Sequence, residues 1–348
     1  MTARALTRLA VLALAAAPAG LSAQGVSAQE FRLKEVASVT AVPPAEIEPR
    51  TILFSDHRGD ESADPVTGLV RFEDWERARP LEKQLLALHP AYVEPTVNVT
   101  LNGVTKPYKK KLHMYVAEAR FVLAKPPGAV NLARFASLQT LQKIDPSIRH
   151  KAMGPADAVP QKDPEAAFNR HPDRRWCEQP AVCVESHYDL EGKLPMGIRL
   201  ANKLEEGGKK IAESIDFQSE IRVLPREEAA RPALMRLAGL DRPVAGALEQ
   251  TLFHVNQIMT FGKLLAVVQP HPTDPGKSVV TAFMALGVKS DVLEKKKEFE
   301  RVPVLRNMVP AQVLMGNSSF NTGTSISAGL PKYVRNRIQA IAGILERE

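Results

Sequence analysis

The chain has little of what metal and nucleotide sites are built from. Only two of its 348 residues are cysteine, and aromatic residues make up 5%. The cysteines and the eight histidines show no CxxC, HxH or HExxH spacing, so the sequence predicts no metal site. Gly276-Lys277-Ser278 resembles the end of a phosphate-binding loop, but His271 stands where the first glycine of that loop is required. We therefore expect no cofactor.

Long apolar runs are also missing, with one exception at the start of the chain. Two arginines precede an apolar segment at residues 9–17, and small residues follow up to Ala23 and Ala28. This pattern predicts a cleaved secretory signal peptide over residues 1–28, with cleavage after Ala23 as the alternative. No later segment approaches the roughly 20 apolar residues of a membrane helix. We expect a soluble protein, periplasmic or secreted, with no transmembrane segment after cleavage.

Charge of neither sign dominates. Lys and Arg number 46 against 39 Asp and Glu, which gives a formal net charge of +7 at pH 7 with His neutral. The basic residues are spread along the chain without interleaved aromatic residues, so the sequence predicts no nucleic-acid binding. A solvated exterior explains the basic excess more simply than contact with an anionic envelope surface, although the second reading stays open.

The two cysteines predict one disulfide, because an even count in an exported chain favours pairing. Cys177 and Cys183 lie too far apart on a straight strand to bond, so the chain has to turn between them, and Pro180 suits such a turn. We expect this bridge to pin a long surface excursion at about residues 145–181. A redox-active pair is the alternative, but such pairs more typically have CxxC spacing.

The rest of the chain divides into an irregular lead-in at residues 29–70 and a single α+β domain at residues 71–348. Apolar residues at helical spacing predict helices at 71–89, 132–144 and 333–345. Alternating or β-rich apolar segments predict strands at 97–101, 112–123, 182–190, 215–223, 251–259, 263–269 and 278–287. Short links between the later strands favour antiparallel pairing.

The last predicted helix is amphipathic. Its apolar stripe includes Val334, Ile338, Ile341 and Leu345, and basic residues such as Arg337 lie off that stripe. A curved antiparallel sheet covered by helices and closed by this long terminal helix is similar to lipid-binding helix-grip proteins, by analogy at the level of the fold alone. A pocket between sheet and helix would be lined by Phe253, Val255, Val267, Phe283, Val334 and Ile338. A filled core is the alternative.

Three functional interpretations follow. The leading one is non-enzymatic binding of an apolar or amphipathic small molecule or an envelope component. The second is a hydrolase-type enzyme that uses His187 with Glu185 and Asp189, because these titratable side chains project from one face of a predicted strand. An exposed strand face explains that trio more simply. The third is a protein–protein interaction module of the cell envelope, and the sequence does not decide whether the protein is an enzyme.

Overall fold

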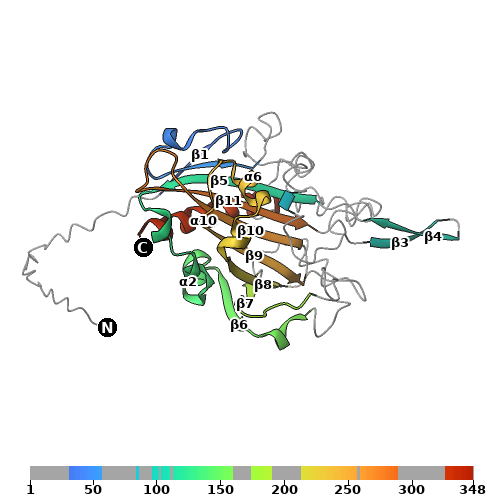
Figure 1. The fold of residues 1–348 in the computed structure, drawn as a ribbon. Coiled ribbons are helices and arrows are strands. Elements are labelled where there is room, and N and C mark those ends of the chain that lie inside the picture. Colours follow the sequence, from blue (N-terminus) through green and yellow to red (C-terminus); the bar gives the residue numbers. More distant parts are fainter. Residues whose placement is uncertain are drawn as a thin grey trace, which may run out of the picture.

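The computed structural model describes residues 31–56, 84–85, 96–101, 103–109, 113–159, 174–189, 213–256, 259–288 and 326–347. Within these residues, nine strands form one sheet in the order β1-β2-β5-β11-β10-β9-β8-β7-β6 (Figure 1). Neighbouring strands pair antiparallel, except that β1 and β2 are parallel. Strands β3 and β4 pair separately as a hairpin.

Of the described strands, seven overlap segments predicted from the sequence, and the other four, β1, β2, β4 and β6, lie outside those segments. The sheet consists of β1 (Arg32–Glu35), β2 (Thr51–Ser55), β5 (His113–Leu123), β6 (Ile148–Met153), β7 (Val182–Asp189), β8 (Ser214–Leu224), β9 (Gly246–Val255), β10 (Met259–Pro270) and β11 (Ser278–Val288). The hairpin consists of β3 (Thr96–Leu101) and β4 (Val104–Lys109). From β8 to β11 the strands pair in chain order, so the predicted antiparallel arrangement of this part is confirmed.

The helices are short, apart from the last one. They are η1 (Pro44–Glu46), η3 (Pro127–Ala129), η4 (Leu132–Ala136), α2 (Leu138–Ile144), η5 (Pro155–Asp157), α5 (Arg226–Ala229), α6 (Pro232–Ala238) and α10 (Ile326–Arg347). The helix predicted at 132–144 is divided at Ser137, which has extended backbone angles. Its hydroxyl accepts a hydrogen bond of 3.2 Å from the Thr140 amide and so caps α2.

Helices cover both faces of the sheet. Leu264 and Ala266 of β10 pack in the core cluster that contains α2, η4 and α10, whereas their neighbours Leu265 and Val267 pack in a second cluster with α6. The faces alternate in this way because successive strand residues point to opposite sides. The predicted α+β class is therefore confirmed, with α10 across one face (Figure 1). No helix of the described residues is both long enough and apolar enough to span a membrane.

The structure differs from the sequence-based prediction at both edges of the sheet. The predicted lead-in at 29–70 contains β1 and β2, and the predicted excursion at 145–181 begins with the edge strand β6. Every residue of β2 is buried, and a strand buried on both faces does not alternate between apolar and polar residues. The predicted signal peptide and most of the predicted helix at 71–89 lie outside the described residues.

Candidate functional site

The predicted disulfide is present, and it holds a loop against the sheet. Cys177 and Cys183 are bonded, with their Cα atoms 5.4 Å apart. The Cys177 amide donates to Glu220 Oε2 at 2.8 Å, and Arg174 pairs with Glu220 Oε1 at 2.5 Å. Glu220 is only 2% exposed, so its carboxylate is buried where the loop meets β8. The bridge thus belongs to a segment that is docked on β8, and residues 160–173 of the predicted excursion lie outside the described residues.

Aromatic packing fixes the same loop. Trp176 is 1% exposed and stacks on Phe253 with ring centroids 4.7 Å apart. The Arg174 guanidinium lies 4.6 Å from the Trp176 ring centroid, a cation–π contact. Phe253 therefore packs under the disulfide loop, and Val255 is buried at the end of the same strand.

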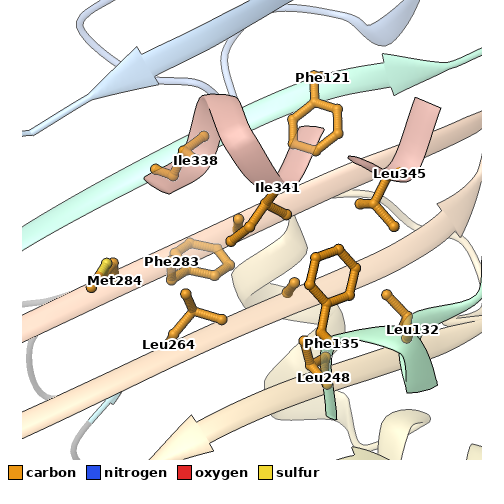
Figure 2. Close-up of a pocket in the computed structure, with 12 residues that line it drawn as sticks. Phe121, Leu132, Phe135, Leu248, Leu264, Phe283, Met284, Ile338, Ile341 and Leu345 are labelled. Carbon is orange, nitrogen blue, oxygen red and sulfur yellow. The ribbon is translucent and has the colours of Figure 1, made fainter. Parts of the chain in front are cut away.

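The space between the sheet, η4 and α10 is a small apolar cavity of about 20 Å³ (Figure 2). Its lining is entirely hydrophobic: Phe121, Leu132, Phe135, Leu248, Leu264, Ala266, Ala282, Phe283, Met284, Ile338, Ile341 and Leu345. A cavity of this size has room for about one water molecule, whereas ligand pockets measure roughly 300–1,000 Å³. The filled core that the sequence left as an alternative is therefore what the structure contains.

The six residues predicted to line a pocket are not brought together. Ile338 and Phe283 contribute to the lining of the cavity, and Val334 belongs to the same core cluster as Ile338. Val267 packs on the α6 side of the sheet, and Phe253 lies under the disulfide loop. Residues two apart in a strand share a face, but local sequence patterns do not relate the faces of different strands to one another.

A buried polar cluster borders the cavity. Arg337 of α10, only 5% exposed, forms an ion pair with Asp145 and donates to Tyr333 Oη at 3.0 Å and to Gln250 Oε1 at 2.7 Å. Gln250 lies opposite the cavity-lining Leu264 across the β9–β10 pair. Arg337 therefore faces the core and not the solvent, contrary to its predicted place off the apolar stripe.

Burial shifts the pKa values of two side chains in this cluster, Arg337 and Tyr333. It lowers the pKa of Arg337 to about 10, so the guanidinium stays charged at neutral pH. It raises the pKa of the Tyr333 phenol above its usual value, so that group stays neutral. The cluster thus places one buried cation beside one carboxylate at the sheet–α10 interface.

His187 forms a second polar site, at the ends of β7 and β8. Its Nδ1 lies 2.5 Å from Asp216 Oδ1, and the other carboxylate oxygen of Asp216 accepts from Ser214 Oγ at 2.8 Å and from Asn256 Nδ2 at 3.0 Å. The His187 side chain is 35% exposed. A carboxylate fixed by two other donors orients an imidazole in this way in general-base sites.

The predicted partners of His187 lie elsewhere. Glu185 accepts a long hydrogen bond of 3.4 Å from Gln218, and Asp189 lies opposite Ser214 in the strand register. The sequence-based interpretation did not include Asp216, although this residue lies within the strand predicted at 215–223. The pairing depends on the register between β7 and β8, which places His187 directly opposite Asp216 and which the sequence does not specify.

A third polar group lies on the sheet face that points away from α10. Lys263 is 1% exposed and donates to Glu249 Oε2 at 2.6 Å and to Thr251 Oγ1 at 3.0 Å. Arg222 reaches the other oxygen of Glu249 at 3.3 Å. Burial lowers the pKa of Lys263, and the neighbouring Glu249 opposes that shift. These contacts tie β8, β9 and β10 together, which is a structural role.

No protein-family model and no curated protein matches the chain. The aromatase/cyclase Zhui from Streptomyces sp. R1128 is similar over 68% of this chain and 95% of its own length, with 10% identity and a TM-score of 0.33. A START superfamily protein from Mycobacterium smegmatis is similar over 67% and 97%, with 10% identity and a TM-score of 0.31.

Norcoclaurine synthase from Thalictrum flavum, in a truncated form, is similar over 69% of this chain and 99% of its own, with 9% identity and a TM-score of 0.30. At these identities and TM-scores, the similarities carry no argument about what the chain binds. Function is therefore argued from the residues described above.

Proposed function

We propose that the protein binds an apolar or amphipathic small molecule between the sheet and α10. The observation that carries the proposal is the entirely hydrophobic lining of the cavity at this interface, next to the buried polar cluster at Arg337 (Figure 2). A ligand of this class would exchange contacts with water for contacts with apolar side chains, which is favourable. Because the enclosed volume is only about 20 Å³, the ligand has to enlarge the cavity as it enters.

The wall formed by η4 is the part that we expect to move. This 3-10 helix is five residues long, has no side-chain cap, and supplies Leu132 and Phe135 to the lining. Helix α10 is held more firmly, since Arg335 pairs with Asp56 at 2.9 Å and the Leu345 carbonyl accepts from Lys125 at 2.9 Å. Local opening favours elements with few anchoring contacts, so we expect η4 to swing outward and α10 to stay in place.

The polar cluster supports binding of an amphipathic ligand. Arg337 Nε is buried and has no hydrogen-bond partner among the described residues. A buried donor without a partner costs free energy, and an oxygen of a polar head group would remove that cost. The apolar part of such a ligand would then lie along the cavity lining, and its head group beside Arg337.

The proposal includes the compartment that the sequence predicts. An exported protein that carries an apolar molecule would work in the periplasm or outside the cell. There it would meet lipids and other envelope components that water alone dissolves poorly.

Native mass spectrometry of protein purified from its own source, followed by denaturing extraction, tests whether a small apolar molecule accompanies it. Titration with Nile red gives a second readout, because this probe fluoresces in apolar surroundings. We expect Phe135→Ala to strengthen Nile red binding, since it enlarges the cavity, and Ala266→Leu to weaken binding, since it fills the cavity. Val223→Leu, at an exposed position, is the matched control.

The proposal fails if Nile red binds equally well to Phe135→Ala, Ala266→Leu and the control. It also fails if neither the wild-type protein nor the Phe135→Ala variant binds Nile red, provided that circular dichroism shows the variant to be folded. Both results would leave the interface as an ordinary packed core.

The His187–Asp216 pair supports a second candidate function, general-base hydrolysis of a small substrate. The 2.5 Å contact holds Nδ1 on the carboxylate, so Nε2 is the nitrogen that would take a proton from an attacking water. With p-nitrophenyl acetate as substrate, we expect Asp216→Asn and His187→Gln each to abolish any turnover. Turnover that survives both substitutions would exclude this site, and Glu185→Gln serves as the neighbouring control.

A further inference from the structure

The β3–β4 hairpin extends away from the rest of the described structure (Figure 1). It pairs with none of the nine strands of the main sheet. At its turn, Gly103 has a φ of +78°, a conformation that favours glycine. A two-stranded hairpin by itself is marginally stable in water, so an extended one of this length calls for a partner.

The tip of the hairpin is open to solvent and carries an apolar side chain. Val104, the first residue after the turn, is 55% exposed, which makes it the most exposed large hydrophobic residue among those the structure describes. The strand register pairs the backbone of Val104 with that of Leu101. The exposed Val104 side chain therefore lies at the end of the hairpin that points away from the sheet, where it is accessible to a partner (Figure 1).

The stem of the hairpin is basic. Lys106 and Lys109 lie on β4. No acidic residue lies between Glu94 and Glu118 in the sequence. A stem whose sequence contains lysines and no acidic residue attracts an anionic surface, and like-charged stems repel one another. The charge therefore disfavours a second copy of this hairpin as the partner.

We propose that the β3–β4 hairpin is an arm that binds an anionic lipid surface, with its lysines at the head groups and its tip among them. Charge attracts the stem, and burial of the apolar tip adds to the binding. A nucleic acid would meet the lysines equally well but would leave Val104 exposed, so the apolar tip favours lipid. This contact is separate from the proposed cavity ligand, because it involves none of the residues that line the cavity.

Co-sedimentation of the full chain with vesicles tests this arm. We expect binding to phosphatidylcholine vesicles that contain phosphatidylglycerol, weaker binding as salt is raised, and none to phosphatidylcholine alone. Each lysine near such a surface contributes about 1 kcal/mol, equivalent to about fivefold in affinity. The double variant Lys106→Gln/Lys109→Gln should therefore bind about 25-fold more weakly. Val104→Asp should bind more weakly than Val104→Thr.

The matched control is Lys143→Gln/Lys151→Gln, which removes the same charge from two exposed lysines of the main body. We expect it to bind nearly as well as the wild type. Equal losses of vesicle binding in the arm variant and the control variant would overturn the proposal, because the net charge of the protein would then explain the binding. The proposal is also overturned if the chain does not bind anionic vesicles. Binding of duplex DNA, or self-association, that depends on Lys106 and Lys109 while vesicle binding does not would overturn it as well. Unchanged circular dichroism spectra ensure that the variants are folded.

Discussion

The buried ion pair between Arg337 and Asp145 allows a quantitative test of how α10 is held. Both residues are 5% exposed, so water cannot replace either partner. Asp145→Asn keeps the size of the side chain and one oxygen acceptor but removes the charge. The Arg337 guanidinium, whose pKa of about 10 keeps it charged at neutral pH, would then be buried without a counter-ion.

Removal of one partner from a buried pair costs about 3–5 kcal/mol, a large part of the roughly 5–15 kcal/mol that stabilises a typical domain. We expect urea unfolding at neutral pH, followed by far-UV circular dichroism, to give a loss in this range for Asp145→Asn. The exposed pair Arg175–Glu178 provides the control, and Glu178→Gln should change the free energy of unfolding little.

A double-mutant cycle separates the pair from its surroundings. Arg337→Met in the Asp145→Asn background removes the uncompensated charge, so the double variant should be more stable than Asp145→Asn alone. The reasoning is refuted if Asp145→Asn costs less than about 1 kcal/mol, which is the range of exposed pairs. It is also refuted if the two substitutions are simply additive.

Three further predictions concern other buried or half-buried polar groups. Glu220→Gln should lower the free energy of unfolding by about 1.5–3 kcal/mol and shift Trp176 fluorescence to longer wavelength, because the carboxylate that holds the disulfide loop is lost. Burial lowers the pKa of His150, so stability should be fully present above about pH 6.5 and decline at lower pH; His150→Gln should flatten that decline in urea titrations. Burial raises the pKa of Tyr333, so stability should decline above about pH 10, where the unfolded chain ionises first, and less steeply in Tyr333→Phe.

The sequence predicts those strands that keep one polar face. The sequences of β7 and β8 alternate between apolar and polar residues, so the positions of these strands and the polar residues around His187 could be predicted directly. Strand β2 could not be predicted from the sequence, because all five of its residues are buried and its sequence resembles any short apolar segment. Local patterns therefore specify strands, but they do not specify which strand is buried on both sides.

The candidate sites depended on contacts between segments far apart in the chain. His187 meets Asp216 through strand register, and Arg337 meets Asp145 across 192 positions. Arg337 is expected at the surface because it is charged, although it lies three residues after Val334 and four before Ile341 and so borders the apolar stripe. It is buried because Asp145 and Gln250, from two other elements, supply the charge and the acceptor that it needs.

Methyl-labelled NMR of the Nile red complex shows directly whether an apolar molecule binds between the sheet and α10. We expect intermolecular contacts between the probe and the methyl groups of Ile338, Ile341 and Leu345, with η4 resonances shifted as that wall moves. Contacts confined to other surfaces of the protein, with those three residues unchanged at saturating probe, would contradict binding at this interface.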